Sequence, residues 1–405
     1  MTGAAWLGDE STPWPVVPAR ALFSERKTKS TVDDVHLTPS QKHGVIPQAE
    51  YMRVTGNRVV LNLSGSENMR HVEVGDYVSH LRSFQGGLEY STLPGKVSSA
   101  YTVLKPVTNL EPRFYKYLFK STLYVQALQT TTDQLRDGQS IRYAQFARIA
   151  LPQPALEIQN LIADYLDRET EQIDAFIAKN EELIALLTER RSSYSRALVT
   201  RGIDQTAPTK ASEVSWLGPI PEHWSIVRAR YLCTVGTGDG DTIDAVDEGE
   251  FPFYVRSDKP QRSDRYGFDT PAVLTSGDGA GVGKVFHLVD GKFAAHQRVY
   301  VLHDFREVLP AFFYWFFSSY FGIVALDGSA KSTVDSVRRH MITNMPIAVP
   351  PIEEQKRIVE AVQRGVSAID GAAASARRSI ALAKERRAAL ISAAVTGKID
   401  AGGTP

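Results

Sequence analysis

The sequence predicts an α+β fold that is built twice, with two pseudo-repeated mixed α/β globules separated by an antiparallel coiled coil of two long helices. Two observations predict it. The opening stretch WLGDESTPWPVVPAR, from Trp6 to Arg20, returns 210 residues later as WLGPIPEHWSIVRAR, from Trp216 to Arg230, in a chain with only five tryptophans. Each copy then ends in a long stretch whose apolar residues recur three or four positions apart, the spacing of a helix with one apolar face.

The repeat divides the chain into four segments. At 405 residues the chain is too long for one ordinary core, so more than one domain is expected. The match resumes with a shift of 198 residues at Ile149 and Ile347, and with a shift of 196 residues from Gln159 and Gln355 onward. We expect a first globular domain over 1–152, a central long helix over 153–204, a second globular domain over 205–351 and a C-terminal long helix over 352–405.

The central segment predicts one uninterrupted helix. It has neither Gly nor Pro from Gln159 to Val199, and its apolar residues follow one seam, as in a coiled coil. The C-terminal helix keeps this seam, although Gly365 and Gly371 are expected to weaken it locally. The central helix has a net charge of −4 (6 Lys/Arg, 10 Asp/Glu) and the C-terminal helix +3 (9 Lys/Arg, 6 Asp/Glu). Antiparallel pairing of the two with each other is therefore favoured over pairing with other chains.

Both globular segments predict twisted sheets with Gly-rich turns and one aromatic helix each. The stretch from Val308 to Leu326 has no charged residue and is nearly long enough to cross a bilayer. Its copy in the first repeat contains Arg113, Lys116 and Lys120, which are costly in lipid, so we expect buried helices. Period-two or β-branched runs predict strands at Val59–Leu63, Ala100–Leu104, Phe251–Val255, Ala272–Thr275 and Arg298–Leu302.

The sequence offers no catalytic centre, metal site or cofactor site. Its nine histidines are scattered, and the single cysteine, Cys233, is better explained as a small apolar residue than as a nucleophile. The stretch GDGAGVGK, from Gly277 to Lys284, resembles a phosphate loop. It has Asp278 where that motif needs Gly and Val285 where it needs Ser or Thr, so we favour a turn between strands. A lone cysteine and the absence of a visible export signal favour a cytoplasmic location.

Loops rich in Arg, Lys, Gln and Ser supply the candidate binding residues. Such side chains contact base edges and phosphates in DNA-binding proteins, although similar loops are often ordinary solvated turns. The net charge is zero overall, with +4 in the first globular segment and −3 in the second, so charge alone does not predict a nucleic-acid binder. The candidates, chosen by residue type and loop position, are Arg82, Lys96, Gln139, Arg142, Lys284, Gln297, Arg298 and Lys331.

The chain resembles the specificity subunits of type I restriction-modification systems. The resemblance rests on the two WLG openings and on IAVPPIEEQ, from Ile347 to Gln355, before the second long helix. The first long helix begins with a poorer version, in which the family's usual Glu-Gln pair is Ile158-Gln159. The stretch LRSFQGG, from Leu81 to Gly87, is similar to one class of target-recognition domain. The resemblance covers nearly the whole chain, including its two-fold layout.

The resemblance implies a DNA-binding subunit that has no active site of its own. Each globular domain would be a target-recognition domain that reads one half of a bipartite DNA sequence, and the two helices would be the spacer between the halves. The implied partners are double-stranded DNA, two adenine methyltransferase subunits and restriction subunits that act as motor and nuclease. Neither a membrane nor a cofactor is implied.

Two other classes of function remain open from the residues alone. A self-contained DNA-modifying enzyme would carry a cofactor-binding or carboxylate–lysine constellation in both halves, and none is visible in the sequence. A coiled-coil scaffold whose globules bind protein agrees with the acidic second globule.

Overall fold

The computed structural model describes residues 5–7, 12–57, 69–80, 87–130, 142–327 and 336–399. The chain forms two compact units. The first unit consists of Met1–Asn180 and Arg378–Pro405, and the second of Glu181–Arg377. Each unit mixes helices and sheets, which confirms the predicted fold class.

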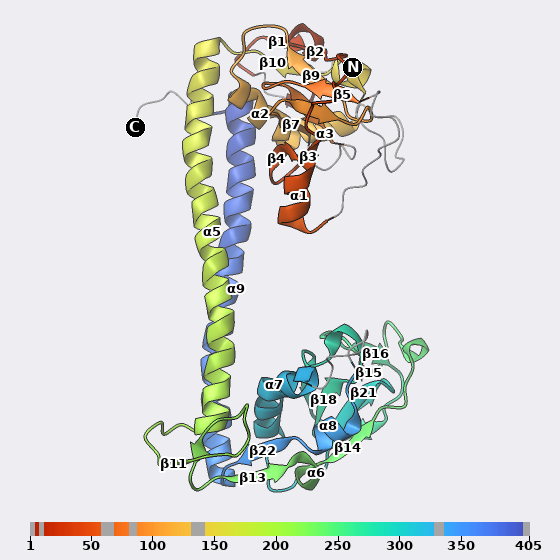
Figure 1. Cartoon of the computed structure of the whole chain (residues 1–405), viewed down its shortest axis with the longest axis vertical. Coiled ribbons are helices and arrows are strands. Elements are labelled where there is room, and N and C mark those ends of the chain that lie inside the picture. Colours follow the sequence, from red (N-terminus) through yellow and green to blue (C-terminus); the bar gives the residue numbers. More distant parts are fainter. Residues whose placement is uncertain are drawn as a thin grey trace. The chain divides into compact units, whose positions relative to one another are not determined.

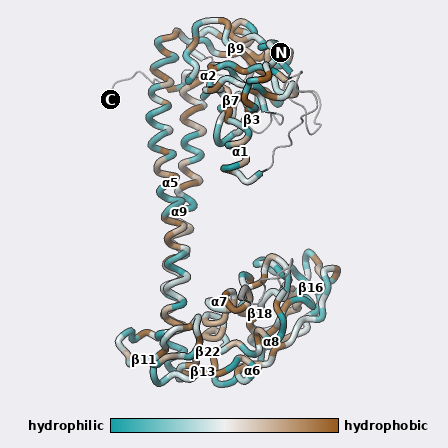
Figure 2. Tube along the Cα trace, in the orientation of Figure 1, coloured by the Kyte–Doolittle hydropathy of each residue, from teal (hydrophilic) through white to brown (hydrophobic). Residues whose placement is uncertain are grey.

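Two long helices contribute to both units. Helix α5 (Leu156–Arg201) and helix α9 (Ile352–Thr396) pack against each other in antiparallel orientation (Figure 1), as the charge difference predicts. Apolar and polar residues alternate along both helices (Figure 2), because one face of each helix packs on the other while the rest is exposed.

The first unit is built on a sheet with strand order β2-β9-β6-β7, in which every pair is antiparallel. The antiparallel pairs β1–β10, β3–β4 and β5–β8 complete its strands. The strand bounds are β1 (Val16–Pro18), β2 (Phe23–Glu25), β3 (Leu37–Ser40), β4 (Gly44–Pro47), β5 (Arg70–Val72), β6 (Tyr77–Ser79), β7 (Leu88–Tyr90), β8 (Gly95–Val97), β9 (Val103–Pro106) and β10 (Ala150–Pro152). The shorter helices are α1 (Gln48–Thr55), α2 (Pro112–Lys120), α3 (Thr122–Thr130) and α4 (Tyr143–Phe146).

The second unit repeats this sheet with order β14-β21-β18-β19 and adds another, β16-β15-β20-β17. Within the added sheet only β15 and β20 run parallel. The strand bounds are β11 (Thr209–Lys210), β12 (Ile220–Pro221), β13 (Ser225–Arg228), β14 (Thr234–Thr237), β15 (Phe251–Tyr254), β16 (Gln261–Ser263), β17 (Phe268–Asp269), β18 (Ala272–Ser276), β19 (Phe286–Val289), β20 (Lys292–Ala295), β21 (Val299–His303) and β22 (Pro346–Val349). The shorter helices are α6 (Ala229–Leu232), α7 (Pro310–Asp327) and α8 (Arg339–Thr343).

The predicted strands in the described residues are present with small shifts in their ends, as β9, β15, β18 and β21. The predicted strand Val59–Leu63 lies outside the described residues. The aromatic stretch forms α7, whose Phe312, Phe313, Phe316 and Phe317 are completely buried in the core of the second unit. Within the described ranges, no helix combines the length and the apolar character that crossing a membrane requires.

The aromatic helices confirm the repeat at the level of packing. Trp14 meets Phe114 edge to face, with ring centroids 6.2 Å apart, and Trp224 meets Phe312 in the same way at 6.3 Å. Such pairs stabilise the fold by about 0.5–1.5 kcal/mol beyond the contribution of the apolar area that they bury. The first copy differs in one respect, because the helix breaks at Ser121, which has extended backbone angles between α2 and α3.

Strand pairing corrects the alignment of the two repeats. Val17 pairs with Leu151 in β1–β10, and Val227 pairs with Ile347 in β13–β22. The residue that corresponds to Ile347 is thus Leu151, which gives these strands the same shift as the long helices, whereas the sequence match had aligned Ile347 with Ile149. Ile149 and Leu151, two similar apolar residues two positions apart, made the sequence match ambiguous.

The C-terminal end of each long helix completes the core of the globule that belongs to the other half of the sequence. Leu198 and Val199, at the end of α5, are buried in the core of the second unit. Their equivalents in the repeat, Ala394 and Val395 at the end of α9, are buried in the core of the first unit. The two halves of the chain are therefore interlocked rather than merely joined.

Two equivalent ion pairs join the helices. In the first unit, Arg387 Nε donates to Asp174 Oδ1 at 2.9 Å, and in the second unit Arg191 Nε donates to Asp370 Oδ1 at 2.9 Å. Asp370 is the repeat equivalent of Asp174, and Arg387 is that of Arg191. Exchanging the two halves of the repeat therefore turns one ion pair into the other. This reciprocity is the pattern of a two-fold symmetric interface, here formed within one chain.

Gly365 has a structural role that the sequence did not predict. A Cβ atom at this position would lie 2.1 Å from Tyr194 Cε1, so the glycine makes the notch in α9 that receives the Tyr194 ring of α5. Tyr194 Oη then donates to Ala361 O at 3.2 Å. The expectation that Gly365 weakens the helix locally stays a prediction, and the structure adds this packing role; Gly371 has no atom within 4 Å of a built Cβ and shows no such role.

A buried glutamine ties each long helix to the globule that precedes it. Gln159 Oε1 accepts from Glu111 N at 2.9 Å, and its Nε2 donates to Pro154 O at 2.8 Å. Its equivalent, Gln355, accepts from Leu309 N at 2.7 Å and donates to Pro350 O at 2.8 Å. Both glutamines are at most 2% exposed. Each receives the N–H of the residue that precedes the aromatic helix, so the starts of two helices are held together.

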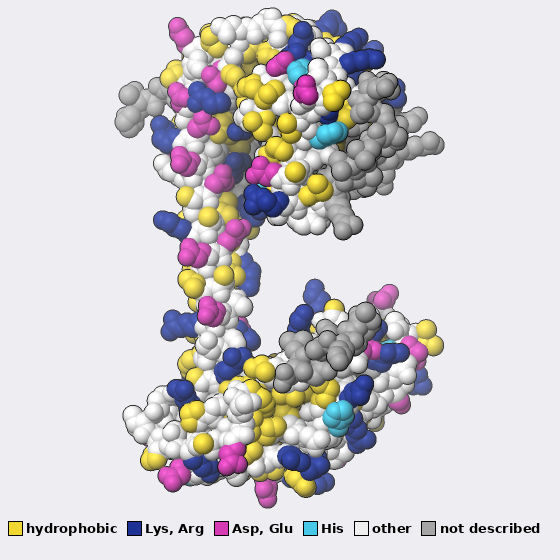
Figure 3. All heavy atoms as spheres, in the orientation of Figure 1, with side chains coloured by type: hydrophobic (Ala, Val, Ile, Leu, Met, Phe, Trp, Pro, Cys, Tyr) yellow, Lys and Arg dark blue, Asp and Glu magenta, His cyan; other side chains and the backbone are white. Residues whose placement is uncertain are grey.

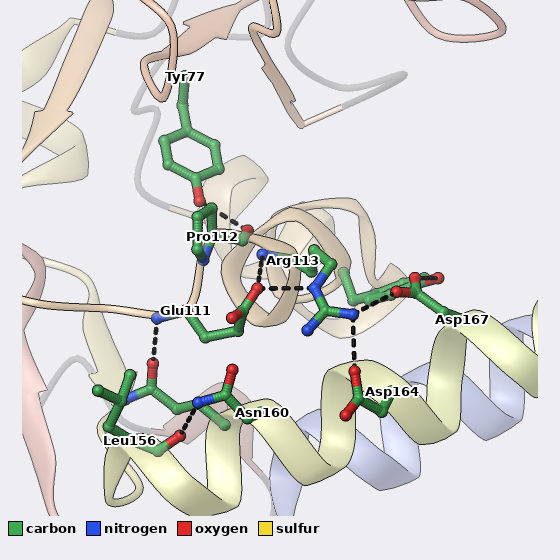
Figure 4. A network of polar contacts seen from close by, with 10 residues as sticks. Tyr77, Glu111, Pro112, Arg113, Leu156, Asn160, Asp164 and Asp167 are labelled. Atoms are coloured by element: carbon green, nitrogen blue, oxygen red, sulfur yellow. Dashed lines mark hydrogen bonds and ion pairs between the residues drawn. The ribbon is translucent and has the colours of Figure 1, made fainter.

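In the first unit a charged network reinforces this contact (Figure 4). Arg113, at the start of α2, donates to Glu111 at 2.8 Å and to Asp164 and Asp167 of α5 at 2.7 and 2.8 Å. Burial, followed by the hydrogen bond to Asp167, raises the pKa of Tyr117 to about 12, so this hydroxyl remains a donor to the carboxylate.

We predict opposite effects of alanine at the two glycines of α9. Gly365→Ala should lower the free energy of unfolding by about 1–3 kcal/mol, because a well-packed contact would be overfilled. Gly371→Ala should raise it by up to about 1 kcal/mol, because the helix gains propensity without a clash. Urea unfolding followed by circular dichroism measures both, and equal effects of the two variants would contradict the notch.

We also predict that Gln355→Glu destabilises the chain by about 1–3 kcal/mol. A carboxylate would retain the bond from Leu309 N but would face Pro350 O and Glu307 O without a proton to donate. The matched control is Gln363→Glu, at an exposed position of the same helix, which should change stability by less than about 0.5 kcal/mol. Thermal unfolding of both variants decides the point, and indistinguishable melting would disprove the clamp.

Candidate nucleic-acid interface

In the second unit, an arginine–aspartate cluster lies where loops from the two sheets meet. We define it by Arg256, which follows β15, Asp278, which follows β18, and Arg298, which precedes β21. Asp278 accepts a hydrogen bond from Arg256 Nη1 at 2.8 Å through Oδ1, and one from Arg298 Nη1 through Oδ2. The arginine side chains are 47% and 61% exposed, whereas that of Asp278 is 15% exposed. Two accessible cations therefore share one largely covered anion.

Glycines allow these loops to approach closely. Gly277 N donates to Arg298 O at 2.8 Å, and a Cβ on Gly277 would lie 2.8 Å from that same oxygen. A Cβ on Gly281 would lie 2.8 Å from Arg256 O. Larger residues at these two positions would push apart the loops that carry the arginines. The stretch from Gly277 to Lys284 joins β18 to β19, so it is a turn between strands, as favoured from the sequence.

The electrostatics of the cluster keep it ionised. Burial pushes the pKa of Asp278 upward, but the hydrogen bonds from Arg256 and Arg298 outweigh this, and the pKa lies below its usual range. Burial, with Arg256 nearby, lowers the pKa of His296. Because His296 Nδ1 accepts from Arg298 N at 3.0 Å, the neutral ring carries its proton on Nε2.

An open cavity of about 390 Å³ adjoins the cluster and is lined by Arg256, Asp278, His296 and the turn from Gly279 to Gly281, among others. Gln297 lies beside it, with Nε2 3.4 Å from Asp241 Oδ2. The cavity presents hydrogen-bond donors and acceptors to solvent, which is what recognition of a base edge requires.

The structure brings together only some of the candidates taken from the sequence. Gln297 and Arg298 are neighbours at the cluster, and Lys284 is exposed at the end of the same turn that carries Asp278. Arg142 is exposed at the start of α4 in the first unit. Arg82, Gln139 and Lys331 lie outside the described residues.

Lys96 occupies a different environment from the one expected. It lies on β8 and is 5% exposed, and its Nζ donates to Thr31 O at 3.1 Å and Val32 O at 3.0 Å. The preceding Gly95 lies against the same segment, because a Cβ there would be 2.5 Å from Val35 O. The Gly-Lys pair thus holds the loop before β3, and Lys96 would have to leave these carbonyls to contact DNA.

The sequence did not identify Arg256 or Asp278. Asp278 was visible only as a mismatch in a phosphate-loop pattern, and Arg256 had no distinguishing signal, since its partner is 22 residues away on the other sheet. The Gly-rich turn around Asp278 was the available signal for close loop packing.

The helix pair carries a second surface feature. In the first unit, a groove of about 430 Å³ lies between α5 and α9 and includes Ile173, Phe176, Leu382 and Ala383. Phe176 is 48% and Leu382 65% exposed, so apolar surface of both helices faces solvent at this groove. On the face seen in Figure 3, Lys and Arg alternate with Asp and Glu along the helices, so this surface has no dominant charge.

The described residues show no reactive centre. No group of His, Cys, Asp and Glu within them could hold a metal ion. Cys233 is 4% exposed and donates to Ala229 O, and burial raises the pKa of its thiol to about 12.

Comparisons with known proteins agree on one family. Residues 221–370 match the family model described as type I restriction modification DNA specificity domain. A type I restriction enzyme EcoDI specificity subunit of Escherichia coli is 28% identical over 182 residues, which are 45% of this chain and 40% of that protein. The chain thus matches less than half the length of this relative.

Solved structures share the fold of nearly the whole chain. A chain from a study of complex assembly and conformational transition of the type I R-M system has a TM-score of 0.68 at 16% identity, and the match covers 97% of this chain and 100% of that one. The HsdS subunit from Thermoanaerobacter tengcongensis has a TM-score of 0.54 at 16% identity, with 97% and 99% covered.

We predict that Cys233 does not react with thiol reagents in the folded protein. With a pKa of about 12, only about one molecule in 10⁴ carries a thiolate near pH 8, compared with roughly a quarter for an unperturbed cysteine. A chromogenic disulfide should therefore label the chain only after unfolding in guanidinium chloride. Rapid labelling of the native chain would show that this thiol is accessible and activated.

Proposed function

We propose that this chain, which belongs to the family of type I restriction-modification specificity subunits, is the subunit that reads the DNA sequence for its complex. In this proposal, residues 1–152 and 205–351 are target-recognition domains, and each reads one half of a bipartite DNA target. Residues 153–204 and 352–405 form the spacer. The observation that carries the proposal is the repetition of one sheet, one aromatic helix and one glutamine contact in both halves.

Two recognition domains give a reason for the duplication. One domain reads only a few base pairs, and each base pair contributes about 1–3 kcal/mol of discrimination. A second domain on the same chain adds its own discrimination, provided that the distance between the half-sites is fixed. A flexible linker would blur that distance.

The helix pair has the features that such a spacer needs. Helix α5 is continuous over 46 residues and α9 over 45 residues. The equivalent ion pairs and the Tyr194–Gly365 contact fix which residues face each other. The glutamine contacts fasten each globule to the start of its own helix, which limits rotation of the globule on the helix.

We further propose that two adenine methyltransferase subunits dock on the helix pair and that restriction subunits, acting as motor and nuclease, join this complex. The exposed apolar groove at Phe176 and Leu382 supports one docking position. The repeat supports a second, because Leu186, the equivalent of Leu382 in the first half, is 56% exposed. Under this proposal the methyl transfer and DNA cleavage occur on the partner subunits, and this chain supplies the sequence specificity.

The proposal predicts the effect of shortening both helices together. Four residues of helix correspond to about 6 Å and a turn of about 40°, close to the ~35° turn of one base pair. Deleting Glu181–Ile184 together with Arg377–Ile380 keeps the register set by the two ion pairs. The turn equals about one base-pair step and the length nearly two rises of about 3.4 Å, so the gap in the DNA target should shorten by one to two base pairs, with both half-sites unchanged.

Selection of bound duplexes from a random pool, followed by sequencing, measures this change. The control is deletion of Glu181–Ile184 alone, which shifts Arg191 and Tyr194 away from their partners and should lower stability instead. An altered half-site at an unchanged gap would show that the helices are not the spacer.

A further inference from the structure

We propose that Arg298 reads a guanine in the major groove and that Asp278 and Arg256 hold its guanidinium in position to do so. This inference rests on the proposed function, since it names the base that the second recognition domain reads at one position. Arg298 would be the reading residue, and Asp278 and Arg256 would act through it as positioning residues.

The backbone of Arg298 is fixed on both sides. Its N–H donates to His296 Nδ1 at 3.0 Å, and its carbonyl accepts from Gly277 N at 2.8 Å. It directly precedes β21, whose partner β18 leads to Asp278. The Cα positions of Arg298 and Asp278 therefore follow from the register of one antiparallel pair, which leaves the arginine side chain as the variable part.

The side chain is restrained at one end of its guanidinium. Asp278 accepts from Nη1, while among the described residues none accepts from Nε or Nη2. Arg256 reaches Asp278 from the other sheet at 2.8 Å and prevents the carboxylate from turning away. An arginine anchored in this way loses less freedom when it binds, and its free edge has the two-donor geometry that fits guanine O6 and N7.

The charge around the cluster favours a base edge over a phosphate. Asp278 cancels one of the two arginine charges, and Asp241, which is 59% exposed, lies beside His296 and Gln297. The two arginines, Asp278 and Asp241 together have no net charge. Phosphate contacts depend on uncompensated positive charge, whereas bidentate recognition of guanine depends on geometry. Asp278 itself uses both carboxylate oxygens within the cluster, so it is not the reader.

The test compares two variants of the full-length chain that change side-chain chemistry with little change in size. Arg298→Lys keeps the positive charge but removes the planar fork, and Asp278→Asn removes the anionic anchor. The control is Arg230→Lys on α6, which is exposed. Helix α6 leads into β14 at the end where Thr234 pairs with His303, which is the end of β21 opposite Arg298. Each variant is produced with its methyltransferase partner in a host, and methylated adenines are sequenced to give the target motif.

We expect Arg298→Lys to lose the preference for guanine at one position of one half-site by roughly 5- to 150-fold, with the other half-site unchanged. Asp278→Asn should weaken the same preference at the same position by a smaller factor. Arg230→Lys should give the wild-type motif. Melting curves of the purified variants check that each is folded. If Asp278→Asn does not fold, the result for Arg298→Lys alone decides the test.

Three results would overturn the inference. Arg298→Lys could retain the full guanine preference, or both variants could reduce methylation evenly at all sequences, which would mark a phosphate contact or a purely structural ion pair. A wild-type motif with no G·C pair in either half-site would also exclude it. A wild-type chain that gives no bipartite motif at all would refute the proposed function, and is recognised before any variant is compared.

Discussion

The architecture depends on a buried glutamine at the start of each long helix. Gln159 and Gln355 satisfy backbone groups where the long helix meets the aromatic helix of its globule. An unpaired polar group at such a buried place costs about 1–3 kcal/mol, so a globule that tilted away from its helix would lose more than apolar contact. The side chain that fixes the globule belongs to the helix itself, and any change in the helix is therefore passed to the globule.

The internal two-fold relation holds for one ion pair but not for the shape of the helix contact. The ion pairs of Asp174 and Asp370 are equivalent, yet Tyr194 faces Gly365 in the second unit, while the corresponding residues of the repeat are Leu390 and Glu169. If α5 paired with a second copy of α5, Tyr194 would meet Glu169, which offers no notch. Complementary shape thus favours pairing of the two different helices within one chain, and the alanine-rich seam of α9 is part of this fit.

The sequence was sufficient for the fold class and for the pairing of the long helices, because repetition supplied a second, independent reading of these elements. The charged residues of the α2 copy excluded a membrane span for α7, and the opposite charges of the helices predicted their pairing. Contacts between distant loops could not be predicted in this way. Lys96 and Arg298 have the same kind of sequence context. The ammonium group of Lys96 is buried against backbone carbonyls, whereas the guanidinium of Arg298 is exposed beside Asp278. The close packing of the loops at Gly95 and Gly277, which the sequence does not reveal, accompanies this difference.

The zero net charge of the chain agrees with a division of labour in the proposed complex. Affinity for DNA comes largely from cations that neutralise phosphates, and it is insensitive to sequence. A subunit that supplied much of this affinity would bind all sequences and would dilute the discrimination of its base contacts. Pairing Arg256 and Arg298 with Asp278, and interspersing acidic residues along the helices, limits the binding that does not depend on sequence. In the proposed complex, partner subunits would supply the phosphate contacts, and the geometry of a few anchored side chains would determine which sequence is bound.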